Sequence, residues 1–349
     1  MRSKTLHVPL AILADWVSSG AIVTTSQTSP FRFSAGLVLF VGGSSLLKAP
    51  AAQAGEAGVQ ITELTNRLRV ELNGQLFTEY YFKDVPRPYC YPLIGPGGAA
   101  MTRNWPMNTT PDEEHDHPHH RSLWFAHGAV NGHDFWSEAK GFGKIVHERF
   151  DEVKSGKEFG VIKSRNKWVA SDGTVVCTDE RTLRIFKPGA GGERSFDFEI
   201  TLHASNGEVV LGDTKEGTMA VRLAETMRLK GKVGHGHIVN SAGVRDGDTW
   251  GKRADWCDYS GPVEGKTVGI AIFDHPKNPR HPAWWHVRDY GLFAANAFGQ
   301  HDFEKLPDNA AGNFTIAAGK SASFKYRFYL HEGDEKQGKV AERYAEYVR

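Results

Sequence analysis

The feature that most constrains the fold is the alternation of apolar and polar residues around two-residue turn signals. In residues 67–82, apolar side chains recur at every second position on both sides of Asn73-Gly74. Asp172-Gly173 and Asn206-Gly207 interrupt two later alternating segments in the same way. Because Asn-Gly and Asp-Gly favour the tight turns that join antiparallel strands, the sequence predicts three β-hairpins.

Two further alternating segments lie in the second half of the chain, at residues 267–274 and 321–333. In the second of these, every other residue from Phe324 to Leu330 is apolar. An antiparallel strand with one apolar face must stack on another sheet to bury that face. The sequence therefore predicts an all-β, mainly antiparallel fold built as one large β-sandwich.

One helix is expected, at the C-terminus. Asp334 and Gln337 have the spacing of a capping box, and Val340, Tyr344 and Val348 then recur at helical intervals. No linker, charge block or internal repeat divides residues 55–349. We therefore expect these residues to form a single β-sandwich domain that ends in a helix.

Residues 1–54 have the pattern of a leader, with a secretory signal peptide at about residues 31–54. Arg32 precedes a short apolar segment, and Ala52-Gln53-Ala54 matches an A-x-A cleavage site. We expect an exported protein, periplasmic or extracellular. After removal of the leader, no apolar segment reaches the roughly 20 residues that a membrane-spanning helix needs.

Charge and motifs exclude several classes of function. The formal net charge is +1, and no long basic run is present, so a nucleic-acid partner is not expected. The sequence contains no G-x-S-x-G, no Walker loop and no G-x-G-x-x-G after a strand, which argues against serine-hydrolase and nucleotide chemistry. Cys90, Cys177 and Cys257 form no C-x-x-C pair, and we expect them to be buried apolar residues.

Residues 113–128, EEHDHPHHRSLWFAHG, hold five of the sixteen histidines. In an extended strand His115, His117 and His119 would project to one side and Asp116 and His120 to the other. Pro118 lacks a backbone donor, so we expect an edge or a bent entry to a strand here, and the strand proper at residues 121–128. Three interpretations stay open. The imidazoles bind a divalent metal, they bind and protonate a substrate, or they form a polar loop without chemistry. For a metal, the His-x-His spacing makes His117, His119 and His127 the first candidate ligands.

Other polar residues gather in long segments of the second half of the chain. Each of these segments mixes Asp, Arg and His with tryptophan, and long structured loops on a rigid scaffold are where binding sites usually lie. Sugars pack their apolar C–H faces on aromatic rings and need polar partners for their hydroxyls, so a cleft of this composition suits a carbohydrate. The candidate substrate-binding residues are Arg121, Trp124, Lys215, Glu216, Trp285, Arg288 and Asp289.

The sequence therefore favours an exported carbohydrate-active enzyme, a hydrolase, lyase or epimerase that acts on a sugar or glycoside. Imidazole groups titrate near neutral pH and can donate or accept a proton. The candidate catalytic residues are His120, His127, Asp274 and His286. The cofactor is open, with a divalent metal as one candidate. A glycan-binding module without catalysis is the alternative, and a structural exported domain without a small-molecule site is a third.

Several segments resemble the DUF6807 family, whose members also carry the label "methane oxygenase PmoA". The carriers include RPYCYPLIGPGG, DHPHHRSLWFAHGAVNGHDFW, TWGKRADWCDYSGP and FDHPKNPRHPAWWHVRDYGLFAANAFG. The resemblance implies a secreted β-sandwich protein, similar to the supersandwich of galactose mutarotase-like proteins. It implies no catalytic role for any particular residue. Methane oxygenation is not expected, because the membrane-bound enzymes need several long apolar helices that this chain lacks after its leader.

Overall fold

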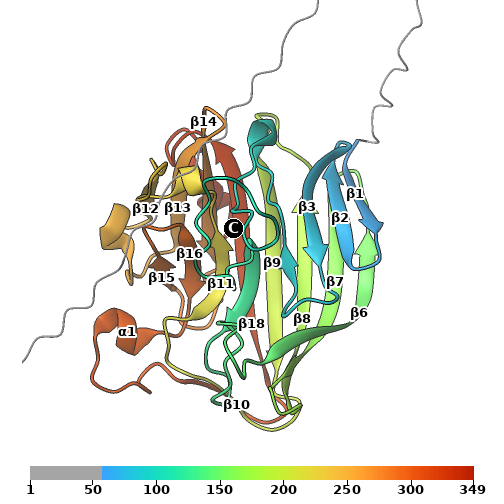
Figure 1. Ribbon diagram of the computed structural model, residues 1–349, viewed down its shortest axis with the longest axis vertical. Helices are drawn as coiled ribbons and strands as arrows, with labels where there is room; N and C mark the ends of the chain where they lie inside the picture. The colour runs from blue at the N-terminus through green and yellow to red at the C-terminus, as the bar shows by residue number, and fades with distance from the viewer. Residues whose placement is uncertain (1–56) are drawn as a thin grey trace, which may run out of the picture. The chain divides into compact units, whose positions relative to one another are not determined.

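The computed structural model describes residues 57–349, and the leader predicted for residues 1–54 lies outside them. Two eight-stranded antiparallel sheets make up the fold, with a separate two-stranded sheet (Figure 1). The first sheet has the order β1 (Val59–Glu63), β2 (Arg67–Leu72), β3 (Gln75–Tyr81), β4 (Tyr89–Cys90), β5 (Leu123–His127), β11 (Gly217–Arg222), β16 (Leu292–Asn296) and β15 (Trp284–Val287).

The second sheet has the order β12 (His237–Asn240), β13 (Trp256–Val263), β14 (Lys266–Asp274), β18 (Ser321–Glu332), β9 (Arg194–His203), β8 (Val175–Phe186), β7 (Phe159–Val169) and β6 (Lys144–Lys154). The small sheet pairs β10 (Val209–Leu211) with β17 (Phe314–Ile316). The helices are α1 (Gln300–Glu304), α2 (Val340–Tyr347) and the short 3-10 turns Pro96–Gly98, Glu225–Met227 and Asp246–Thr249.

The core lies between the two large sheets. Phe125 of β5 contacts Trp168 of β7, Phe198 of β9 and Phe324 of β18, with ring centroids 6.3–6.4 Å apart. The alternating side chains of β18, from Phe324 to Leu330, are buried against this core. The predicted antiparallel β-sandwich is therefore confirmed.

Two of the three predicted hairpins are confirmed. Asn73 and Gly74 both adopt positive φ, 50° and 77°, and join β2 directly to β3. The turn around Gly173 joins β7 to β8. The third hairpin is wrong: a turn forms at Asn206-Gly207, but β9 pairs with β8 and β18, whereas β10 pairs with β17. A turn signal shows where the chain reverses and leaves open which strand becomes the partner.

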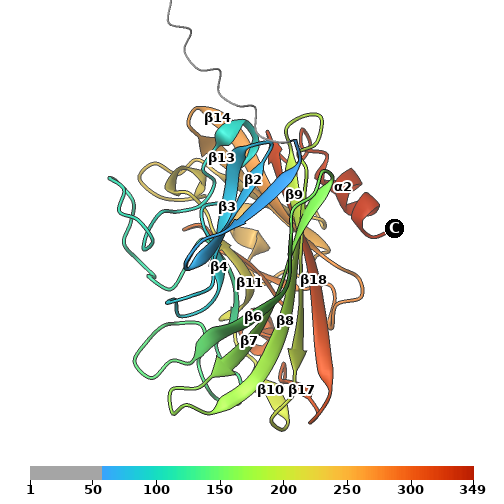
Figure 2. The same ribbon diagram turned by 90° about the vertical axis from the view of Figure 1, so that its right-hand side faces the viewer.

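The C-terminal helix is also present, but it starts later than the capping-box spacing indicates. Asp334 Oδ1 accepts hydrogen bonds from the Lys336 and Gln337 amides, and Gln337 Oε1 accepts one from the Asp334 amide. These bonds close a turn, and α2 itself begins at Val340. Val340 and Tyr344 pack with Phe273 and Tyr329 on the face of the second sheet that points away from the first (Figure 2).

The three cysteines are buried, as expected, and all three are free. Burial raises the pKa of the Cys90 thiol to about 12. Within residues 57–349 no helix is long and apolar enough to cross a membrane.

Candidate functional site

One row of side chains crosses the outer face of the first sheet, the face turned away from the core. Tyr89 of β4, Trp124 of β5, Ala220 of β11, Ala294 of β16 and His286 of β15 lie directly opposite one another in successive strands. Strand alternation sends the neighbouring Phe125 to the opposite, inner face. The two alanines in the middle of the row, Ala220 and Ala294, are buried.

Loops from distant parts of the sequence meet over this row. The His117 ring stacks on Tyr290, with centroids 5.1 Å apart and planes at 7°, and on His120 at 4.8 Å. The Arg288 guanidinium lies 5.3 Å from the Tyr290 ring and 5.9 Å from the Trp250 ring. We call His117, His120, Trp250, Arg288 and Tyr290 the outer-face cluster.

A local turn brings His117 into this cluster. His117 has φ of 40°, and the His120 amide donates to the His117 carbonyl at 3.0 Å, which closes a turn with Pro118 at its second position. The chain therefore bends at Pro118 before it enters β5, as expected, and residues 115–120 do not form an extended strand. Because the chain turns, His117 and His120 face each other instead of projecting to opposite sides.

Buried arginines hold the histidine segment against the sheet. Arg103 and Arg222, whose side chains have no exposed surface, both donate to Asp116, and Arg222 also contacts His120 Nδ1 at 3.1 Å. Arg103 donates in addition to the His117 carbonyl at 3.0 Å. Planar guanidinium groups with several donors suit such multiple contacts. The guanidinium groups of Arg103 and Arg222 thus hold the histidine segment against the sheet, and the carboxylate of Asp116 offsets their positive charges.

Asp116 in turn orients His117, whose Nδ1 lies 2.8 Å from Asp116 Oδ2. Partial burial opposes ionisation of this carboxyl, but the hydrogen bond from His117 and the positive charges of Arg222 and Arg103 outweigh it. Together they lower the pKa of Asp116 below its usual range. The His117 side chain is 40 % exposed, so this aspartate–histidine pair reaches solvent.

Lys215 and Glu216 lie in the loop directly before β11, beside the cluster. Lys215 Nζ is 3.9 Å from Glu216 Oε1 and 3.6 Å from Asp302 Oδ1. Burial raises the pKa of Glu216, although the charges of Lys215 and His117 oppose this shift. Glu216 is therefore a partly exposed carboxyl whose charge interacts with that of His117.

The three histidines expected to act in proton transfer are buried. His120 packs against Trp124 and Trp136, and burial with the charges of His119 and Arg222 lowers the pKa of His120 well below its usual range. His127 Nε2 is 2.8 Å from the Gly212 carbonyl, and His286 Nδ1 is 2.6 Å from the Lys215 carbonyl. Burial lowers the pKa of both His127 and His286 to about 4.

The three candidate metal ligands are not brought together. His117 and His119 lie edge to face, with centroids 5.7 Å apart, whereas His127 contacts Phe298 on the core side of the sheet. Nowhere in residues 57–349 do three or more His, Cys, Asp or Glu side chains form a group that could hold a metal ion. We therefore assign no metal ligands.

Of the remaining candidate residues, some lie in or next to the outer-face cluster, and the others make ion pairs or hydrogen bonds that hold the fold together. Arg288 belongs to the cluster, and Asp289 follows it and pairs with Lys230 at 3.2 Å. Arg121 makes two bonds to Glu138, at 2.8 and 2.9 Å. Asp274 lies in the second sheet and accepts bonds from Asn278, His281 and the Ala283 amide, which hold the loop after β14.

Most of the tryptophans expected in a sugar-binding cleft are buried. Trp285 packs in the core and donates to the Ala254 carbonyl at 2.9 Å. Trp124 and Trp136 are buried on the outer face beneath His120. Trp250 is one of the partly exposed ones, and it lies in the cluster. Sequence composition alone did not separate the buried tryptophans from the partly exposed ones, because a strand that is buried on both faces shows no alternation of apolar and polar residues.

Sequence reasoning missed four residues of this site: Arg103, Asp116, Arg222 and Tyr290. Arg222 lies within the apolar segment TMAVRLA, and an arginine inside a buried strand needs a carboxylate partner. This arginine inside an apolar segment was therefore a signal from which a buried ion pair could have been predicted. The pairing of Arg222 with Asp116 spans more than 100 residues of sequence, so no local pattern contains it.

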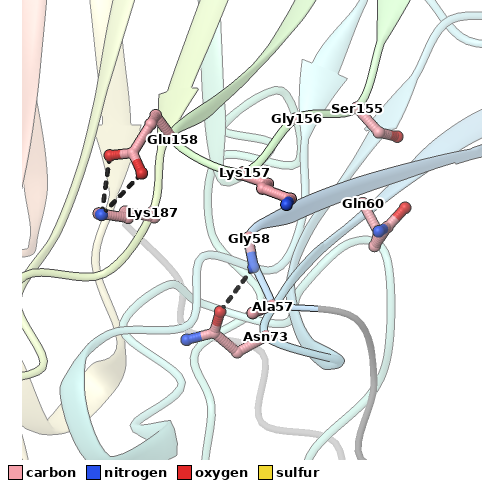
Figure 3. A pocket seen from close by; sticks show the side chains of 9 residues that line it. All are labelled: Ala57, Gly58, Gln60, Asn73, Ser155, Gly156, Lys157, Glu158 and Lys187. Atoms are coloured by element: carbon pink, nitrogen blue, oxygen red, sulfur yellow. Dashed lines mark hydrogen bonds and ion pairs between the residues drawn. The ribbon is translucent and has the colours of Figure 1, made fainter.

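A cavity of about 660 Å³, shown in Figure 3, lies beside β1, at the other edge of the first sheet. Gly58, whose amide donates to Asn73 Oδ1 at 2.8 Å, lines it together with the exposed pair Glu158 and Lys187. None of the candidate site residues lines this cavity. Glu158 pairs with Lys187 there, Lys157 also lines the cavity, and none of the lining residues is aromatic. The outer-face cluster, which combines aromatic rings with polar groups, is therefore the better candidate site.

No curated protein matches the chain. The family of unknown function DUF6807 matches it over residues 67–345, a range that includes both large sheets almost completely and every residue of the outer-face cluster. By this match, the chain belongs to the DUF6807 family.

Proposed function

We propose that this protein is an exported carbohydrate-active enzyme whose active site is the outer-face cluster. The observation that carries the proposal is the stacking of His117 on Tyr290 at 5.1 Å, beside Arg288 and Trp250. The site therefore combines the Asp116–His117 pair, which reaches solvent, with the partly exposed rings of Trp250 and Tyr290. Aromatic faces bind the C–H faces of sugars, and precisely placed polar groups orient the hydroxyls.

In this proposal His117 and Glu216 exchange protons with the substrate. With His117 Nδ1 donating to Asp116, Nε2 is the ring nitrogen that can reach a sugar. Glu216 supplies a second group, from the loop that precedes β11. An acid and a base from separate elements can serve epimerisation, elimination or hydrolysis, and we leave the choice among these to substrate screening.

The test is a screen of the mature protein against glycosides and 3-keto-glycosides. We expect turnover of at least one of them, and a loss in kcat of about 100-fold or more in His117→Gln. His237→Gln is the matched control, because His237 is 74 % exposed and lies outside the cluster. Equal activity of the two variants would remove His117 from the reaction.

A glycan-binding module is the second candidate, favoured by the partly exposed rings of Trp250 and Tyr290. It predicts that the wild-type protein binds a saccharide without converting it. Neither the wild type nor His117→Gln would then show any turnover. Saccharide binding without any turnover in the screen would favour this module over the enzyme.

Export is a separate part of the proposal, supported by the A-x-A site at Ala52-Gln53-Ala54. Mass spectrometry of the N-terminal peptide of the protein from the cell exterior or periplasm should find Gly55 as the first residue. An uncleaved protein that stays in the cytoplasm would contradict it.

A further inference from the structure

We propose that Arg288 binds an anionic group of the saccharide, and that this group is the carboxylate of a uronic acid. This inference rests on the proposed function, because it specifies the substrate class of the same site. Its basis is an arginine without a charged partner, a cavity beside it and aromatic rings that fix its position.

The Arg288 guanidinium makes no hydrogen bond or ion pair within residues 57–349; its contacts are the rings of Trp250 and Tyr290. The neighbouring arginines differ. Arg121 pairs with Glu138, Arg222 with Asp116, and Arg228 with Glu225. An arginine among aromatic rings is stabilised by their faces, but its donors still need acceptors.

A cavity of about 350 Å³ adjoins Arg288 and is also lined by Lys230, Gly247, Trp250, Val287 and Asp289. Its volume is at the lower end of the range for small-molecule sites. Asp289 is offset by Lys230, with Nζ and Oδ2 3.2 Å apart. The cavity therefore retains one uncompensated positive charge, that of Arg288.

The aromatic side of the cavity is held in place. The Trp250 ring packs edge to face on Phe303 at 5.3 Å and on His286 at 6.4 Å. A sugar ring can lie on such a fixed indole while its carboxylate meets the guanidinium. Arginine binds carboxylates through two parallel N–H donors, a geometry that a neutral hydroxymethyl group cannot match.

Matched pairs of sugars test this inference. Methyl glucuronide and methyl glucoside differ only in carrying a carboxylate or a hydroxymethyl group, and so do methyl galacturonide and methyl galactoside. Titration calorimetry at low salt should show at least one uronide binding about 10- to 100-fold more tightly than its neutral partner, as expected for charge-assisted hydrogen bonds. Added salt should reduce this preference.

Arg288→Gln should abolish the preference for the uronide, so that each uronide and its neutral partner bind to this variant with equal affinity. Arg253→Gln is the matched control, since Arg253 also stacks on a tryptophan, Trp284, at 4.5 Å but outside the cluster. A preference that survives Arg288→Gln, or equal affinities within each pair, would overturn the inference. Methyl glucoside 6-sulfate tests whether the anionic group is a carboxylate or a sulfate. If this sulfate binds tightly and the uronides do not, the carboxylate assignment is overturned.

The two proposals fail in different ways. If neutral sugars are bound and converted without a preference for uronides, only the present inference is overturned. If neither neutral nor acidic sugars bind or react, both this inference and the proposed function are overturned.

Discussion

Replacing Asp116 by asparagine removes the carboxylate to which the buried Arg103 and Arg222 both donate. The Arg222 bond is 2.8 Å long, and hydrogen bonds to charged groups each contribute about 1.5–3 kcal/mol. Two such bonds give an upper range of about 3–6 kcal/mol. Because 29 % of the Asp116 side chain is exposed and asparagine can still accept one bond, we expect the lower end, about 3 kcal/mol.

Urea unfolding measures this loss. With a urea dependence of about 3 kcal/mol per M for a domain of this size, Asp116→Asn should lower the unfolding midpoint by about 1 M. Asp151→Asn is the control: Asp151 also bonds two arginines, Arg149 and Arg165, but on the exposed strand β6. Its midpoint should hardly move. The reasoning is refuted if the two variants shift the midpoint equally.

The same variant predicts a pH dependence. The pKa of Asp116 is lowered in the folded state, so its contribution is complete above the pKa of the unfolded chain, about 3.9. As the pH falls below this value, the contribution is lost. The stability difference between the wild type and Asp116→Asn should therefore be constant above about pH 5 and shrink below about pH 4.

Phe125→Ala should destabilise the domain by about 3–5 kcal/mol in urea unfolding, because the ring contacts three aromatic residues of the opposite sheet; a loss under 1 kcal/mol would contradict this packing. His127 and His286 have pKa values lowered by burial to about 4, against 6.5 when unfolded. Between pH 6.5 and 4 the unfolded chain therefore binds more protons than the folded protein. The free energy of unfolding should decrease as the pH is lowered from 6.5 to 4, and it should decrease less steeply in the double variant His127→Asn/His286→Asn. An unchanged slope would show that these imidazoles are protonated in the folded state.

Much of the fold was predictable because strand periodicity is local. The alternation of Leu68, Val70 and Leu72, or of Phe324 to Leu330, shows directly which face meets the core. Strand partners are a long-range property. The hairpin predicted at Asn206-Gly207 was wrong for this reason. The chain reverses at that turn, but β10 pairs with β17 in the small sheet instead of with β9.

The candidate site was predictable in part. The histidine segment and the segment from His286 to Tyr290 were both identified, and the structure brings them into contact through His117 and Tyr290. Which imidazole reaches solvent was not predictable from alternation, because the turn at Pro118 reverses the chain. The buried arginines that fix this turn come from other strands, so their partners depend on the complete fold.

The most direct test of the account is hydrogen–deuterium exchange of the protein with and without a saturating saccharide from the screen. The central claim is that residues 115–121 and 286–290, with Trp250, form one binding site. We predict that the saccharide slows exchange in these segments together. Slower exchange only around Gly58, Gly156 and Lys187, or in only one of the cluster's segments, would contradict the claim.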